Sequence, residues 1–109
     1  METNTLVTHK KFKSLGIGCI SKVLKSSYKV NFGKDDVSTC KENVLEVVDT
    51  SQCKTISFKE LRAMTFTNSP NIPKYVIIGN ELRHYIGIGW VCERVVTHAD
   101  LSRYPRVVD

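Results

Sequence analysis

The sequence contains no long apolar run. Of its 109 residues, 41% are hydrophobic, but no stretch approaches the roughly 20 consecutive apolar residues that a membrane-spanning helix needs. The first residues, METNTLVTHKKF, also lack the apolar segment of a secretory signal. These absences predict a soluble, cytoplasmic protein with no membrane partner. The length suits one compact domain or two very small barrels that share an interface.

Closely spaced cysteines are missing as well. Cys19, Cys40, Cys53 and Cys92 lie far apart, and none belongs to a C-x-x-C pair of the kind that structural zinc sites use. A zinc site made from these cysteines and the histidines would need ligands from four separate segments. We therefore predict reduced thiols, mostly buried, with Cys19 and Cys92 in apolar strands, and we predict no metal or other cofactor.

No arrangement typical of catalysis can be recognised. Gly16 and Gly87 each begin a Gly-x-Gly step, but neither step continues to G-x-G-x-x-G or leads into a helix that would hold a phosphate. His84 and Glu93 lie on strands predicted to be neighbours and are expected to meet, yet no nucleophile accompanies them. The sequence therefore predicts a protein that is not an enzyme. A small hydrolase that uses His84 or His98 is the lowest-ranked alternative.

The first half of the chain does contain the alternating hydrophobicity of β-strands. Three segments show it, namely residues 18–24, 26–33 and 44–49. In the second segment, Tyr28, Val30 and Phe32 fall on one face. A turn is expected at residues 33–36 and a helical turn at residues 40–43. The pattern is that of a meander of short strands.

The β pattern stops at residues 50–72. Ser57 is followed three positions later by Glu60, which is the capping box of a helix start, and the apolar residues after it recur on one helical face. The stretch TNSPNIP then predicts a loop. We interpret the whole segment as a connecting helix and loop.

A second β meander is predicted at residues 73–109. Its strands are KYVII, ELRHYI and WVCERVV, with a Gly79–Asn80 turn between the first two. Thr97 and Asp100 form another capping box before a short helix, and the chain ends in RVVD.

Each half contains one Gly-Ile-Gly step, at residues 16–18 and 87–89. Glycines on both sides of an isoleucine let a strand bend sharply while the isoleucine stays buried. We expect both steps to serve this purpose. They represent either a divergent duplication or two convergent uses of one bend, and convergence is preferred.

Acidic residues are absent between Thr3 and Lys34, a stretch that contains seven lysines. The net charge of +5 also favours an acidic partner. We predict a contact surface for nucleic acid or an acidic protein face, formed by Lys10, Lys11, Lys13, Lys22 and Lys25, with Tyr28 beside them. The alternative is a lysine face that only keeps the protein hydrated.

Trp90 is the only tryptophan and directly follows the second glycine step. Glycines leave open space beside a large ring, so Trp90 is a candidate for a protein-binding surface, together with Tyr85 and Arg94. Burial in the core is the alternative for this tryptophan.

Residues 9–49, HKKFKSLGIGCISKVLKSSYKVNFGKDDVSTCKENVLEVVD, resemble the Tudor-like, SH3-like small barrels of UvrD-type helicases and CarD-type RNA-polymerase-binding proteins. The matching positions are His9, Phe12, Gly16, Gly18, Val30, Phe32, Leu45 and Glu46. The resemblance implies a small barrel without catalytic activity that contacts RNA polymerase, a repair protein or nucleic acid.

The predicted fold is mainly β with short helices. A Tudor-like small β-barrel at residues 8–49 is followed by the connection at 50–72 and by a second small β-meander unit at 73–109, which is expected to be SH3-like and to pack on the first. The predicted function is that of a small basic binding module for nucleic acid or for the transcription and repair machinery, such as a phage or mobile-element accessory protein. An inhibitor or adaptor that binds protein through the Trp90 surface is the alternative.

Overall fold

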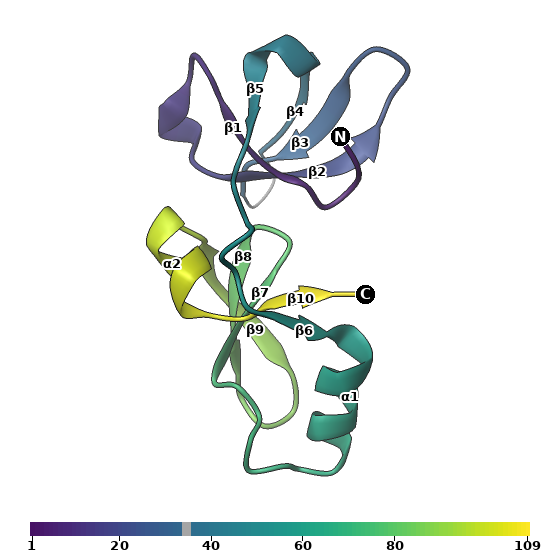
Figure 1. Ribbon diagram of the computed structural model, residues 1–109, viewed down its shortest axis with the longest axis vertical. Coiled ribbons are helices and arrows are strands. Elements are labelled where there is room, and N and C mark those ends of the chain that lie inside the picture. Colours follow the sequence, from purple (N-terminus) through teal and green to yellow (C-terminus); the bar gives the residue numbers. More distant parts are fainter. Residues whose placement is uncertain (34–35) are drawn as a thin grey trace.

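The computed structural model describes residues 1–33 and 36–109. Within these residues, ten strands and two α-helices form two units stacked along the long axis of the molecule, which measures 44 × 27 × 26 Å (Figure 1). The predicted mainly β class with short helices is confirmed. In the described part of the chain, no helix has the length and apolar character needed to cross a membrane. Half of the predicted turn at 33–36 lies outside the described residues.

The N-terminal unit is an open, five-stranded antiparallel sheet in the order β4-β3-β2-β1-β5. Its strands are β1 (Leu6–His9), β2 (Gly18–Val23), β3 (Tyr28–Asn31), β4 (Val37–Cys40) and β5 (Leu45–Val47). Short 3₁₀ helices at Lys13–Leu15 and Glu42–Val44 precede β2 and β5. No ladder joins β4 to β5 in the described residues, so the sheet curls around its core without closing.

Both faces of this sheet are covered near its centre. Val7 and Ile20 point into an inner cluster with Val30, Phe32 and other apolar residues. Their chain neighbours Leu6 and Cys19 point the opposite way, toward the C-terminal unit. Because consecutive residues are buried, β1 shows no alternation, and the sequence did not predict it.

The C-terminal unit is a mixed sheet in the order β6-β10-β7-β8-β9. Its strands are β6 (Thr55–Ser57), β7 (Tyr75–Ile78), β8 (Glu81–Tyr85), β9 (Trp90–Val95) and β10 (Arg106–Val108), and its helices are α1 (Phe58–Phe66) and α2 (His98–Arg103). The predicted meander is β7-β8-β9. The final strand β10 lies parallel to both β6 and β7. The segment 50–72, predicted as a connection, therefore contributes a strand and a helix to this unit.

Both predicted helix starts are observed. The Ser57 hydroxyl accepts a hydrogen bond of 3.0 Å from the Glu60 N–H at the start of α1, and Thr97 and Asp100 form a complete capping box on α2. Helix α1 covers one face of the sheet, where Leu61 joins a cluster with Ile56 and Val76. Helix α2 covers the other face through Leu101.

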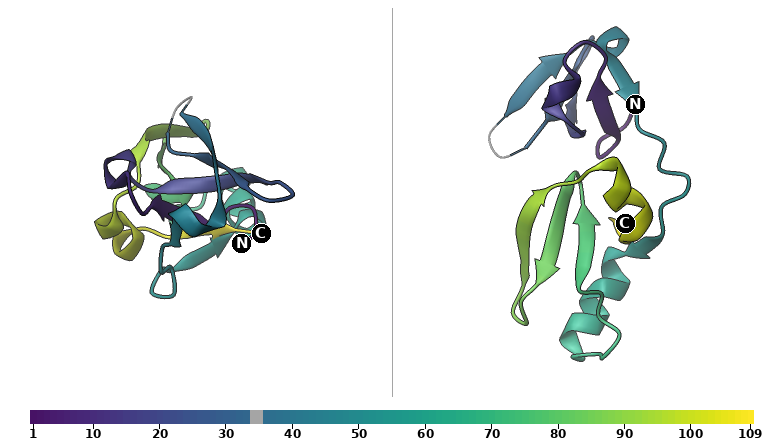
Figure 2. Two further views of the ribbon diagram at one scale, coloured as in Figure 1. Left: turned by 90° about the horizontal axis from the view of Figure 1, so that it is seen from above. Right: turned by 90° about the vertical axis from the view of Figure 1, so that its left-hand side faces the viewer.

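One apolar cluster joins the two units. Leu6, Ile17, Cys19 and Val48 from the N-terminal sheet pack with Ile77, Leu82, Val96 and Leu101 from the C-terminal unit. The buried Asn80 side chain donates hydrogen bonds of 3.0 Å to the carbonyl oxygens of Ile17 and Asn31. Helix α2 lies at this junction, whereas α1 lies at the far end (Figure 2). A shared core and satisfied polar groups make the units one body.

The two Gly-Ile-Gly steps are built differently. In the first, Ile17 is buried in the cluster between the units, as predicted. In the second, Ile88 is 94% exposed at the tip of the β8–β9 hairpin, so the expectation of burial is wrong there. Gly89 has open space around its Cα and no left-handed backbone. The second step is a hairpin connection, not a bend over a core.

Candidate binding surfaces

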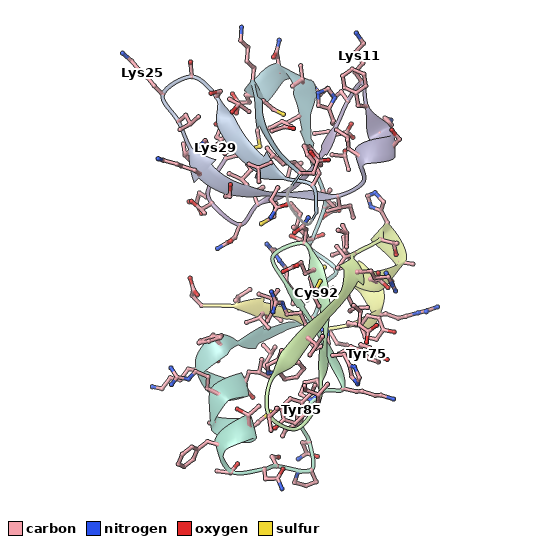
Figure 3. All side chains as sticks on the ribbon, turned by 180° about the vertical axis from the view of Figure 1, so that it is seen from behind. Lys11, Lys25, Lys29, Tyr75, Tyr85 and Cys92 are labelled. Atoms are coloured by element: carbon pink, nitrogen blue, oxygen red, sulfur yellow. The ribbon has the colours of Figure 1, made fainter. Side chains whose placement is uncertain are left out.

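The lysines predicted to form one edge fall into two groups. The loop lysines, in the connection between β1 and β2, are Lys10, Lys11 and Lys13, and the hairpin lysines, along β2 and β3, are Lys22, Lys25 and Lys29. Figure 3 shows Lys11 on one side of the N-terminal unit and Lys25 and Lys29 on the other. The two groups are separated because the two connections leave β2 at its opposite ends. Lys34 lies outside the described residues.

The hairpin lysines include two that face each other directly. Lys22 and Lys29 are register partners in the antiparallel β2–β3 ladder, next to a bulge at Ser21. Both are exposed, and the neighbour of Lys29 on β4 is Thr39. Among the described residues, no carboxylate forms an ion pair with either lysine. Like charges opposite each other in a ladder repel, so this surface is positive and not neutralised.

One of the loop lysines, Lys11, lies over an exposed aromatic ring. His9 Nδ1 accepts hydrogen bonds from the backbone N–H groups of Lys11 and Phe12, at 3.1 and 3.0 Å. The Phe12 ring is half exposed, and Lys11 Nζ lies 5.6 Å from its centroid. Glu46 on the adjacent strand β5 pairs with Thr8, so acidic residues accompany this group. The sequence analysis used His9 and Phe12 only as fold markers and missed this ring.

Tyr28 does not present its ring to a ligand. It is half-buried and packs against the inner cluster of the N-terminal unit. Its register partners are Val23 and Cys40. The prediction of an aromatic side chain beside the lysines is wrong for Tyr28, because residues that alternate with Lys29 face the core.

Trp90 is half-buried, which places it between the two predicted alternatives. One part of its ring packs against the cluster under α1. Tyr85, its register partner on β8, lies 4.9 Å away between ring centroids. Figure 3 shows Tyr85 at the end of the sheet remote from the N-terminal unit. These two candidates are therefore brought together next to the loop of the β8–β9 hairpin.

A groove runs between α1 and this hairpin, at the lower end of Figure 1. It consists of two hollows of about 490 and 260 Å³ that share Arg62, Thr65 and Ile88. Trp90 lines the smaller hollow, and Phe66 lines the larger. Phe66 is 92% exposed, like Ile88 on the opposite wall. Large apolar side chains this exposed on both walls are typical of an interaction site.

Arg94 does not belong to the Trp90 surface. It lies near the other end of β9, where its guanidinium forms a two-pronged ion pair with Asp100, with Nη2 2.9 Å from Oδ1. Arg94 and the N–H and hydroxyl groups of Thr97 hold the pKa of the buried Asp100 down at about 2. The prediction of Arg94 as a binding residue is replaced by a structural role in anchoring α2.

His84 and Glu93 do meet across β8 and β9, with Nδ1 3.0 Å from the carboxylate. The Tyr75 ring stacks on the imidazole, with centroids 5.3 Å apart. In the described residues, no hydroxyl or thiol hydrogen-bonds to His84. The pair is a polar contact beside an aromatic stack on the sheet surface.

The four thiols are free, but they are not all buried. Cys19 and Cys40 lie in the two cores, whereas Cys92 is exposed, contrary to prediction. The difference arises because β9 is an edge strand that α1 covers only at Trp90. Partial desolvation of the thiol, and its hydrogen bond to Glu81, raise the pKa of Cys92.

In the described part of the chain, no three His, Cys, Asp or Glu side chains come together as metal ligands. No protein-family model matches the chain, and comparisons with curated proteins and with solved structures find no significant similarity. A functional proposal therefore depends on the two surfaces, the hairpin lysines and the groove.

Proposed function

We propose that the chain is a small, non-enzymatic binding module that contacts the phosphate backbone of nucleic acid through its hairpin lysines. The observation that carries this proposal is the direct cross-strand pairing of Lys22 with Lys29, with no carboxylate of the described residues paired to either.

The electrostatics of this pair favour an external anion. Two ammonium groups on opposed residues repel each other, and Lys25 at the tip of the same hairpin adds a third positive charge. A phosphate placed between them replaces repulsion with two attractive contacts. The loop lysines are weaker candidates, because β5 beside them carries Glu46.

The type of cation favours contacts with phosphates over contacts with bases. Residues 1–61 contain no arginine, so the formal positive charge on the side chains of the N-terminal unit comes from lysine. Lysine interacts with phosphate as a mobile point charge, whereas reading guanine usually needs the planar fork of arginine or a bidentate lysine in a fixed groove. We therefore expect binding that depends little on base sequence.

The test is the binding of fluorescent duplex DNA, single-stranded DNA and RNA of mixed sequence, measured by anisotropy over a series of salt concentrations. The parent should bind with an affinity that falls steeply with salt. In Lys22→Glu/Lys29→Glu, the slope of log K against log salt on duplex DNA should shrink by about 2, because each lost phosphate contact removes about 0.9.

The matched control is Lys10→Glu/Lys11→Glu, which changes the net charge by the same amount in the same unit. Its binding should fall clearly less than that of the hairpin variant, with both variants folded by circular dichroism. Equal losses would show that total charge matters and the hairpin does not. Binding of poly-glutamate in preference to every nucleic acid would assign the surface to an acidic protein, such as a component of the transcription or repair machinery, and would overturn the proposal.

A further inference from the structure

The groove between α1 and the β8–β9 hairpin lies at the opposite end of the molecule from the hairpin lysines (Figure 1). We propose that it is a second binding site, which takes a short segment of another protein that carries large apolar side chains and a carboxylate. The module then joins a protein to the nucleic acid held at its other end.

The walls of the groove define the apolar part of this ligand. Phe66 from α1 and Ile88 from the hairpin are more than nine-tenths exposed, and Phe58 is half exposed. The floor is made by Trp90 and Leu61, which belong to or pack on the cluster under α1. A rigid floor with exposed apolar walls lets a peptide bury side chains with little rearrangement of the protein.

The charge of the groove defines the polar part of the ligand. Arg62 lines both hollows and is the one charged residue among the described residues that line them. Its guanidinium lies 5.8 Å from the centroid of the Phe58 ring, and it forms no ion pair within the described chain. A guanidinium near an aromatic ring still offers its N–H groups to a carboxylate.

The same charge argues against a second copy of this chain as the occupant. A symmetric contact between two grooves brings one Arg62 near the other, on molecules that each carry a net charge of +5. A segment with aspartate or glutamate beside its apolar residues complements the site, and self-association does not.

The position of Trp90 supplies the assay. It is the only tryptophan and it lines the groove, so an occupant changes its fluorescence directly. The probe is a phage-displayed library of random peptides selected on the full chain. Selected peptides are then synthesised and titrated while Trp90 emission is recorded. We expect them to combine large apolar residues with aspartate or glutamate.

Two variants and two matched controls locate the site. Ile88→Ser and Arg62→Glu should each weaken the selected peptides by about tenfold or more. Ile86→Ser, on the same hairpin but outside the hollows, and Arg103→Glu, on α2, should leave affinity within about twofold. DNA binding should be unchanged in Ile88→Ser, because the two sites are separate.

Three results would overturn the assignment. The first is that no selected peptide alters Trp90 emission, or that the control variants lose as much affinity as the groove variants. The second is Ile88-dependent binding to vesicles of phosphatidylglycerol and phosphatidylcholine, which would make the surface a lipid contact. The third is a dimer in sedimentation equilibrium that Ile88→Ser abolishes, which would make a second copy the occupant.

Discussion

The two Gly-Ile-Gly steps have the same three residues and opposite surroundings. At residues 16–18, the isoleucine is 3% exposed and packs between the two sheets. At residues 87–89, it is 94% exposed at the tip of a hairpin. Both steps begin with a glycine in the left-handed region, with φ of +78° at Gly16 and +92° at Gly87. The positive φ of the first glycine is the feature that the two steps share.

The difference shows that a local motif sets the path of the backbone but not its burial. The first step is followed by a central strand with a second sheet against it, whereas the second joins an edge strand to its neighbour at the free end of the molecule. The sheets themselves also differ, since one is wholly antiparallel and the other contains parallel β10. These differences are what two convergent uses of a glycine step would produce, which is the alternative preferred from the sequence.

Truncating the two isoleucines should separate the steps most clearly. We expect Ile17→Ala to lower the free energy of unfolding by about 3 kcal/mol, because it leaves a cavity in the cluster that joins the units. Ile88→Ala should change it by less than about 0.5 kcal/mol, as exposed substitutions do. Urea unfolding of both variants measures the difference, and similar losses would mean that Ile88 is covered in solution.

The third residues of the steps should differ nearly as much. A Cβ on Gly18 would lie 2.6 Å from a methyl of Val30 and 2.8 Å from the Phe32 ring, so Gly18→Val should cost about 2 kcal/mol or more. A Cβ on Gly89 meets no atom within 4 Å, and Gly89→Val should be close to neutral. Thermal unfolding distinguishes them, and a stable Gly18→Val variant would show that the inner cluster can move aside.

Low pH should destabilise the N-terminal cap of α2, which lies beside the first Gly-Ile-Gly step. Ile17 and Gly16 line a hollow together with Thr97, the first capping residue of α2. Asp100, which completes that cap, has its pKa lowered from 3.8 to about 2 by Arg94 and Thr97. A lowered folded-state pKa stabilises the protein above about pH 4, and this contribution disappears as the pH falls through about 2.

The size of this acid effect is about 1–2 kcal/mol, reduced because the Arg94 side chain is half exposed. Asp100→Asn is the control. In urea unfolding, the parent should be more stable than this variant by that amount near pH 5, and the difference should shrink as the pH falls and vanish below about pH 2. A constant difference across the range would show that Asp100 acts through its shape and not through its charge.

The first glycines should behave alike, with the smallest effects. Gly16→Ala and Gly87→Ala should each cost about 1 kcal/mol, because both adopt positive φ and neither Cβ would meet another atom. Gly89→Ala is the neutral control. Unequal losses of unfolding free energy in Gly16→Ala and Gly87→Ala would contradict the comparison. They would show that the two steps do not depend equally on a glycine with positive φ.

Much of the secondary structure was predictable because the signals are local. Both helix starts were predicted from residues three positions apart, because a cap needs no more than these. The residues are Ser57 with Glu60 and Thr97 with Asp100. The β2–β3 hairpin and the hairpins on either side of β8 followed from alternation. Strands β1, β4 and β6 were missed. All three are short, and β1 and β6 become strands only by pairing with residues distant in the chain.

The candidate sites were less predictable. Lys22 and Lys25 were identified, but their separation from Lys11 follows from the direction of β2, which no charge count reveals. Trp90 and Tyr85 were both named as candidates, and the structure makes them register partners on either side of a short turn. Phe66 and Arg62 were missed, because α1 becomes a groove wall only when it packs beside the β8–β9 hairpin.

The sequence by itself determined the mainly β class, the helix caps, the hairpin turns and the absence of closely spaced metal ligands, all of which depend on residues a few positions apart. The tertiary structure alone decided which apolar residues are buried. Leu6, Ile17 and Cys19 lie under the second sheet, while Ile88 and Phe66 lie at the open end. Burial depends on what packs across from a residue. For this reason the isoleucine is buried in one Gly-Ile-Gly tripeptide of this chain and exposed in the other.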